Sequence, residues 1–253
     1  KFSKKVGGAT LNAFNKTIKK VFLKDKKTKK YEKDEEGCII LPFRPLILGG
    51  DDITIIMRAD FALKFTKNYL AHFEEETSKA NINLTACAGI AYVKEKFPFH
   101  YSANLVEKLC KYAKDKSKRK YSCIQLHQIK DTIFEDYKEV LNREFGTSDQ
   151  FKVGPFYLKD DVKIKDENSK EIGTTAIDHI LDNANILSQA DAPKSSYRQW
   201  INAKFNYPVM ADTLLNRIKK NSNQGKFKDF YSEEELKNAV VYQTLLDVQS
   251  YEN

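Results

Sequence analysis

The sequence has no apolar run near the roughly 20 residues that a membrane-spanning helix needs, which argues against a membrane protein. It opens without the charged-then-apolar leader of a secreted protein, so we expect a cytoplasmic protein. Wholesale disorder is excluded, because 41% of the residues are hydrophobic and 12% are aromatic. A chain of 253 residues fits one large domain, or one compact domain with an extension.

Cysteine and histidine are scarce, at four residues each. Cys38, Cys87, Cys110 and Cys123 form no Cys-x-x-Cys pair, and the histidines are scattered. The ligand spacings of zinc sites are therefore missing from the sequence. With no secretion signal, we expect four reduced, mostly buried thiols and no zinc site.

Positive charge is in excess, with 43 Lys and Arg against 35 Asp and Glu and a formal net charge of +8. It is concentrated in Lys24–Lys33 and Lys111–Lys120. Such an excess attracts polyanions such as nucleotides or nucleic acid. For the first cluster we favour a solvated loop, because the acidic Asp34-Glu35-Glu36 follows at once. For the second cluster a functional role stays open.

Hydrophobic periodicity divides the first half of the chain into alternating elements. It predicts helices over 2–23, 59–79 and 102–118, and strands over 39–48, 53–57, 84–93 and 123–129. Residues 46–57 form a predicted hairpin with Gly49-Gly50-Asp51-Asp52 at its tip. A hairpin beside helical crossovers is typical of a ferredoxin-like α+β sheet. That fold normally opens with a strand, and here the first helix begins almost at Lys1.

The second half of the chain differs in pattern from about residue 131. Polar stretches predict loops at 146–149 and 159–173, and periodic stretches predict helices at 174–190, 194–204, 208–221 and 232–250. Ser232 followed by Glu235 is a capping-box candidate for the last helix. We therefore predict an α+β domain over residues 1–130 and a mainly helical domain over residues 131–253.

The sequence Gly49-Gly50-Asp51-Asp52 is the feature most able to carry chemistry. Glycines allow a tight turn and let a phosphate approach the backbone. Adjacent carboxylates supply hard oxygen ligands for Mg²⁺ or Mn²⁺. Two such ions can activate an attacking hydroxyl and stabilise a leaving pyrophosphate. The alternative is an ordinary surface turn, but the apolar arms LIL and ITII favour an acidic tip held at a sheet edge.

Lys114 is a second candidate, near the end of the helix that follows the small-residue strand LTACAGIAYV. From there its ammonium group could reach a triphosphate as a point charge. The alternative is a solvated lysine, one of many in that segment. We favour the functional interpretation of Lys114 only because the acidic turn is also present.

These residues together carry a resemblance to a known family. LPFRPLILGGDDITII and the later LTACAGIAYVKEKFPFHYSANLVEKLCKYAK resemble the palm domain of the polymerase-like large subunit of type III CRISPR effector complexes (Csm and Cmr) and its stand-alone relatives. The resemblance covers roughly residues 1–130. The second half is similar to the helical domain that follows this palm, without sharp motifs. A more distant likeness is to GGDEF cyclases, but Ile53 stands where those enzymes have Glu-Phe.

The resemblance implies a nucleotidyltransferase that joins ATP 3′–5′ into cyclic oligoadenylate second messengers of antiviral defence. It implies that Asp51 and Asp52 bind Mg²⁺ or Mn²⁺ in a two-metal site, that Gly49 and Gly50 line the phosphates, and that Lys114 holds the triphosphate. The implied partners are CRISPR effector subunits and RNA. Because one palm offers only one nucleotide site, the resemblance also implies a homodimer or a second palm.

One departure from the family pattern leaves alternatives open. The first palm strand, which usually provides a further metal-binding Asp, has no counterpart in this sequence. Either that strand lies upstream of Lys1 or the site is incomplete. The remaining alternatives are therefore a degenerate palm that binds nucleotide or RNA as a scaffold subunit, and a GGDEF-type cyclase that uses GTP.

Overall fold

The computed structural model describes residues 2–22, 33–38, 40–129, 154–165, 169, 171–172, 174–221 and 232–249. These residues belong to two compact units, each assembled from separate stretches of chain. The first unit comprises residues 1–90, 110–125 and 155–174, and the second comprises residues 91–109, 126–154 and 175–253. The predicted domain boundary near residue 130 lies outside the described residues.

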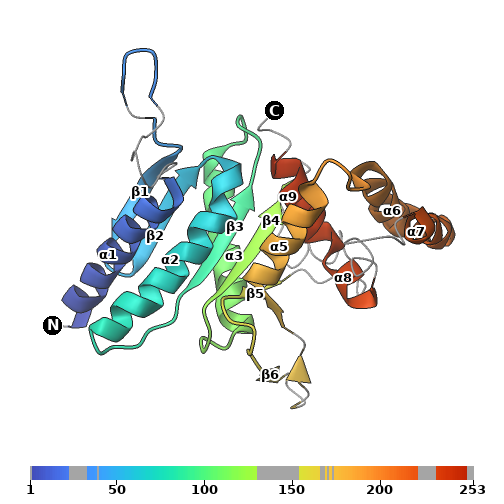
Figure 1. Cartoon of the computed structure of the whole chain (residues 1–253). Coiled ribbons are helices and arrows are strands. Elements are labelled where there is room, and N and C mark those ends of the chain that lie inside the picture. Colours follow the sequence, from blue (N-terminus) through green and yellow to red (C-terminus); the bar gives the residue numbers. More distant parts are fainter. Residues whose placement is uncertain are drawn as a thin grey trace. The chain divides into compact units, whose positions relative to one another are not determined.

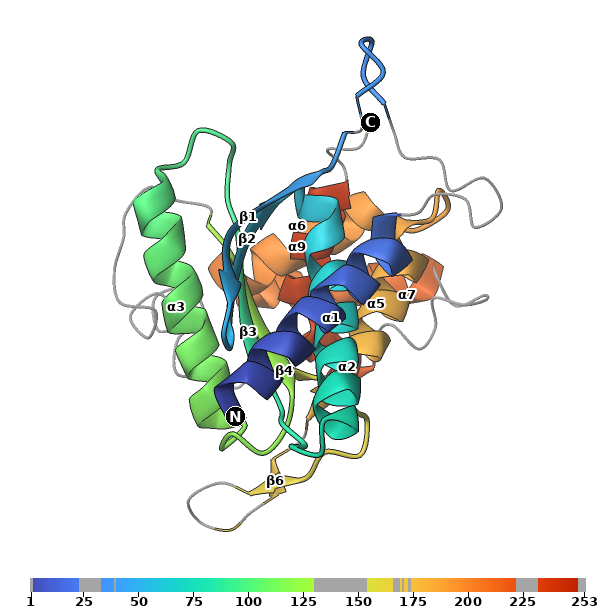
Figure 2. The ribbon, with the colours of Figure 1, turned by 90° about the vertical axis from the view of Figure 1, so that its left-hand side faces the viewer.

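The first unit is built on a helix pair packed against a β-hairpin. Its first four elements are α1 (Phe2–Phe22), β1 (Phe43–Gly49), β2 (Asp52–Met57) and α2 (Ala59–Lys79). The two strands pair antiparallel, and both helices lie side by side on one face of the hairpin (Figures 1 and 2). The predicted helices and hairpin are thus confirmed, and so is the α+β fold class.

Phenylalanine rings join the helices to the hairpin. Phe22 of α1 stacks on Phe43 of β1 with ring centroids 5.0 Å apart, and Phe14 meets the same ring edge-on at 6.1 Å. Phe65 of α2 closes the cluster, 6.0 Å from Phe14 and 2% exposed. Burying a large aromatic side chain contributes roughly 1.5–3 kcal/mol of folding free energy. The cluster therefore holds the hairpin against the helix pair.

In the rest of the first unit, the C-terminal end of one helix packs on a small sheet. Strand β3 (Cys87–Tyr92) neighbours β4 (Cys123–Gln128), and β4 pairs antiparallel with the two-residue β5 (Phe156–Tyr157). Helix α3 (Phe99–Lys116) lies between β3 and β4 in the sequence, and its residue Ala113 is buried with Cys123 and Tyr157. Strands β1 and β2 form a two-stranded sheet of their own.

Two further stretches differ from the sequence-based expectations. Strand β3 is shorter than predicted, because residues 84–86 precede it without strand pairing. The predicted loop 159–173 contains β6 (Ile164–Lys165) and β7 (Glu171–Ile172), which pair antiparallel. Two-residue strands leave no detectable periodicity, so a pattern search reads such a stretch as a loop.

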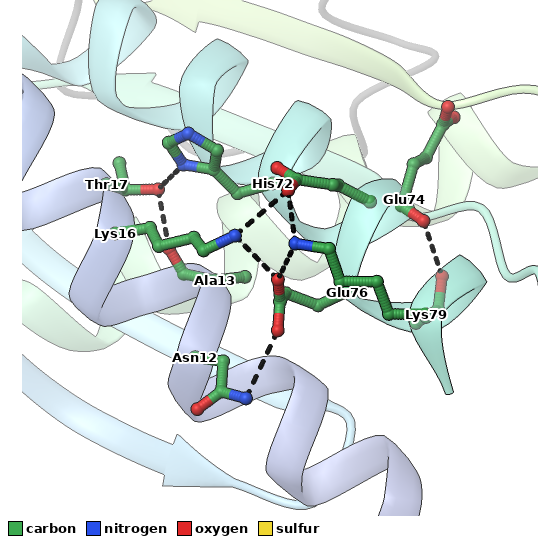
Figure 3. A network of polar contacts seen from close by, with 10 residues as sticks. Asn12, Ala13, Lys16, Thr17, His72, Glu74, Glu76 and Lys79 are labelled. Carbon is green, nitrogen blue, oxygen red and sulfur yellow. Dashed lines mark hydrogen bonds and ion pairs between the residues drawn. The ribbon is translucent and has the colours of Figure 1, made fainter.

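An ion network links α1 to α2 on the polar side of the pair (Figure 3). Lys16 of α1 contacts Glu75 at 3.0 Å and Glu76 at 2.7 Å, and Lys79 contacts both carboxylates from within α2. Asn12 donates to the second oxygen of Glu76 at 3.1 Å. These hydrogen bonds from Lys16, Lys79 and Asn12 lower the pKa of Glu76 to about 2.

The second unit is mainly helical. After β8 (Thr175–Ala176) come α5 (Ile177–Ser188), α6 (Lys194–Asn206), α7 (Pro208–Asn221), α8 (Glu233–Lys237) and α9 (Ala239–Gln249). Helix α6 packs on α7, and α5 packs on α9. Tyr197 and Trp200 of α6 are buried in this core. None of the helices that the structure describes combines the length and apolarity required to cross a bilayer.

The predicted last helix, 232–250, is wrong in one respect, because the chain breaks it into α8 and α9 at the buried Asn238. Ser232 caps α8 by accepting the Glu235 N–H at 3.2 Å. The Glu235 carboxylate does not complete a capping box. It instead accepts from Tyr242 at 2.6 Å and pairs with His179. Glu235 is therefore bound to residues of other helices, and its side chain does not form the predicted capping box.

We predict that the ion network makes the first unit sensitive to acid. The folded-state pKa of Glu76 is depressed from 4.5 to about 2, so its stabilising contribution is present above about pH 4.5 and is lost as the pH falls through about 2. Urea unfolding at about pH 6 and about pH 3 measures the loss. Glu76→Gln is expected to shrink the difference, whereas Glu35→Gln, in an exposed turn, leaves it unchanged. An equal loss in parent and Glu76→Gln would contradict this.

Candidate functional site

The Gly-Gly-Asp-Asp sequence forms the tip of the β1–β2 hairpin, as predicted. Gly49 pairs with Asp52, which leaves Gly50 and Asp51 as the two turn residues. Gly50 has a φ of +61°, a conformation that glycine adopts without steric cost. All four residues are exposed. Within the described residues, neither Asp side chain accepts a hydrogen bond, so both are available to a ligand.

Helix α1 supports this turn from its buried side. The Thr10 hydroxyl, fully buried, donates to the carbonyl oxygen of Gly50 at 2.9 Å. One turn earlier, the missing Cβ of Gly7 would stand 3.9 Å from the Gly50 nitrogen. Sequence reasoning missed Thr10. The available signal was Gly7-Gly8 inside a helix, where glycine costs about 0.5–1 kcal/mol relative to Ala and indicates a close backbone approach.

Lys114 comes from the last turn of α3, one helical turn after Cys110. Burial raises the pKa of the Cys110 thiol; the charge and hydrogen bond of Lys114 act to lower it, and the charge of Asp52, the smallest of these effects, acts to raise it. Lys114 and Asp52 are 62 positions apart in the sequence, and the charges of both act on this one thiol.

A pair of cysteines lies beside this lysine. The Sγ atoms of Cys87 on β3 and Cys123 on β4 are 3.7 Å apart, and the Cys123 thiol donates to Cys87. This hydrogen bond, a second one from Ser117 and the charge of Lys114 lower the pKa of Cys87 to about 6, against the opposing effect of burial. All four cysteines are free; Cys38 is exposed, contrary to the expectation of burial, in a turn where its backbone N–H donates to Asp34.

The other lysines of the 111–120 cluster have separate roles. Lys116 lies over the ring of Tyr112 at 5.5 Å, and Lys118 donates to the carbonyl oxygen of Lys165 at 2.7 Å. Most of the 24–33 cluster lies outside the described residues. Lys114 differs from Lys116 and Lys118 in that its charge acts on the Cys110 and Cys87 thiols.

The donor set limits the kinds of metal site that the turn can form. Among the residues that the structure describes, no group of three or more His, Cys, Asp or Glu could hold a metal ion. Asp51 and Asp52 supply two carboxylates at one turn. Mg²⁺ is commonly bound by one or two carboxylates together with substrate phosphates and water, so this donor set fits Mg²⁺ or Mn²⁺ carried in with a nucleotide.

A helix pair on a hairpin with an acidic Gly-Gly-Asp-Asp tip defines a palm domain. Residues 8–123 match the family model of Cas10/Cmr2, second palm domain. This segment is therefore a palm domain of the type found in the large subunit of type III CRISPR effector complexes, and its function is related to that palm. A search of curated proteins found no match.

We predict that Cys87 reports the position of Lys114 without any ligand. In a Cys38→Ser background, alkylation of Cys87 by iodoacetamide should show a pH midpoint of about 6, because that is the pKa of its thiol. Lys114→Ala should raise the midpoint, since the charge of Lys114 lowers this pKa. Lys116→Ala, two residues along the same helix, should leave it unchanged. A common shift in both variants would mean that Lys114 acts only through the general field.

Proposed function

We propose that the palm is a metal-dependent nucleotidyltransferase that joins ATP into cyclic oligoadenylate-type second messengers in antiviral defence. The observation that carries the proposal is the exposed Gly-Gly-Asp-Asp turn at the tip of the β1–β2 hairpin, whose two carboxylates accept no hydrogen bond within the described residues. Lys114 supports it, because its charge and that of Asp52 both act on the Cys110 thiol. In nucleotidyl transfer the carboxylates would serve the metal, and the lysine would stabilise the leaving pyrophosphate.

The acidic residues, the glycines and the lysine have different roles in this proposal. Asp51 and Asp52 would hold Mg²⁺ or Mn²⁺, which when bound stabilises the charge that develops on the phosphates. The exposed backbone of Gly49 and Gly50 admits a phosphate without a Cβ in the way. Lys114 would draw the triphosphate toward the turn. A ribose hydroxyl then attacks the α-phosphorus, the bond to pyrophosphate breaks, and the hydroxyl loses its proton.

The proposal includes partners beyond ATP. Each palm presents one acidic turn, and cyclisation needs two nucleotides head to tail. A second palm is therefore part of the proposal, from another copy of this chain or from another domain. The palm type points to CRISPR effector subunits as the assembly, and RNA and a cytoplasmic location remain predictions from the sequence.

A degenerate scaffold palm is the second candidate, and one observation favours it. The described residues offer two carboxylates for a metal, without a third ligand nearby. A scaffold would bind nucleotide or RNA without chemistry. Pyrophosphate release with ATP supports the enzyme, release with GTP alone supports a GGDEF-type cyclase, and release with neither leaves the scaffold.

The test that decides between them replaces both acidic residues. Asp51→Asn/Asp52→Asn keeps the size of each side chain and removes the charge that binds the cation. The variant is expected to melt no lower than the parent in metal-free buffer, because adjacent carboxylates repel each other. It should lose the stabilisation that Mg²⁺ and ATP give the parent, about 2.7 kcal/mol at a hundredfold excess over Kd. A structural turn predicts the reverse: no shift in the parent and a lower melting temperature in the variant.

The role of Lys114 is tested separately by ATP affinity. Removing a charge-assisted contact worth about 1.5–3 kcal/mol weakens binding about tenfold to a hundredfold. We therefore expect Lys114→Ala to weaken ATP binding by that factor in calorimetry. Lys116→Ala removes the same charge from the same helix and is expected to change affinity little. Equal losses would show a general electrostatic effect and leave Lys114 as a solvated lysine.

A further inference from the structure

The buried hydroxyl of Thr10 hydrogen-bonds to the peptide unit between Gly50 and Asp51, which leads into the two acidic residues. Thr10 is fully buried, yet its Oγ1 donates to the carbonyl oxygen of the exposed Gly50 at 2.9 Å. The bond joins residues 40 positions apart. The carbonyl of Gly50 and the N–H of Asp51 belong to the same planar peptide. Fixing the carbonyl therefore fixes the direction in which the chain enters Asp51.

The Thr10 hydroxyl has a single proton, and that proton is directed to the carbonyl oxygen of Gly50. Tyr69 of α2 lies near the Thr10 side chain. Burial raises the pKa of the Tyr69 phenol to about 12, and Thr10 acts to lower it.

The turn is closed by the pairing of Gly49 with Asp52, and the Thr10 bond acts on the peptide between them. Gly50 is at a positive φ, and glycine has free access to other conformations, so the Gly50–Asp51 peptide can rotate if it is released. Within the described residues, no protein group hydrogen-bonds to the side chains of Asp51 or Asp52. The backbone therefore sets the direction of each Cα–Cβ bond, and with it the region that each carboxylate can reach.

We propose that Thr10 is a positioning residue: its hydrogen bond to Gly50 sets the backbone direction from which Asp51 and Asp52 meet a metal-bound triphosphate. This inference rests on the proposed function. It assigns to α1 a role in the affinity for metal–nucleotide that is separate from its role in the core. A simple structural anchor would stabilise the hairpin and have no preference between metal-bound and metal-free nucleotide.

The chain offers a matched control on the same helix. Thr17 is also fully buried; it lies two turns further along α1, and its hydroxyl donates to Ala13 at 2.8 Å and contacts His72 at 2.9 Å (Figure 3). It makes no contact with the turn in these bonds. Thr17→Val therefore removes a buried hydroxyl of the same kind without touching the Gly50 carbonyl.

The experiment compares Thr10→Val, Thr10→Ser and Thr17→Val with the parent. Calorimetry measures the affinity of each for Mn²⁺–ATP and for ATP in EDTA. Thr10→Val is expected to weaken Mn²⁺–ATP about twofold to tenfold, as the loss of one hydrogen bond allows, with ATP in EDTA unchanged. Thr10→Ser should restore the parent value, because it keeps the donor. Thr17→Val is expected to match the parent in both titrations.

The outcomes distinguish a failure of the Thr10 inference from a failure of the proposed nucleotidyltransferase function. If the parent gains no affinity from Mn²⁺, the proposed function fails and the inference fails with it. If the parent gains affinity and Thr10→Val gains as much, only the inference is overturned. Equal losses in Thr10→Val and Thr17→Val would overturn it too. Should Thr10→Val not fold, Thr10→Ala removes the same hydroxyl with a smaller side chain; a parent-like Mn²⁺ gain in that variant also overturns the inference.

Discussion

The contact between α1 and the β1–β2 hairpin is the interaction on which the palm depends. In the C-terminal half of α1, Phe14 and Phe22 pack around Phe43 and anchor the base of the hairpin. One turn before Phe14, Thr10 bonds to the turn itself. The apolar contacts stabilise the packing without fixing a direction, and the hydrogen bond supplies the direction. Together they convert a two-stranded hairpin, which is marginally stable by itself, into a rigid support for two carboxylates.

Electrostatics in this protein works at two ranges. The net charge of +8 raises the local concentration of any polyanion and does not choose among them. Selection has to come from position, and Lys114 is placed where its charge acts on the Cys110 and Cys87 thiols. The hydrogen bond that Cys123 donates to Cys87 is the largest effect on this pair; it lowers the pKa of Cys87 and raises that of Cys123.

Elements with a strong local pattern were predictable. Helix α2 begins and ends where its periodicity does, because its buried residues recur from its first turns, at Ala62, to its last turn, at Thr77. The short strands β6 and β7 were not predictable, since a two-residue strand has too few residues to show alternation. Helix α8 shows a different limit. Its cap at Ser232 is local and was predicted. The Glu235 side chain instead accepts a hydrogen bond from Tyr242 of α9 and pairs with His179 of α5, and neither partner could be inferred from a local motif.

By itself the sequence determined the α+β class, the hairpin, the acidic turn and the lysine helix, because each depends on residues close together in the chain. Only the tertiary structure decided that the Thr10 hydroxyl supports Gly50, and that the charges of Lys114 and Asp52 act on one thiol. Both depend on residues tens of positions apart, where local periodicity carries no information. A threonine on the buried side of a helix is unremarkable in a sequence. Its importance arises from the backbone carbonyl that the fold brings to it.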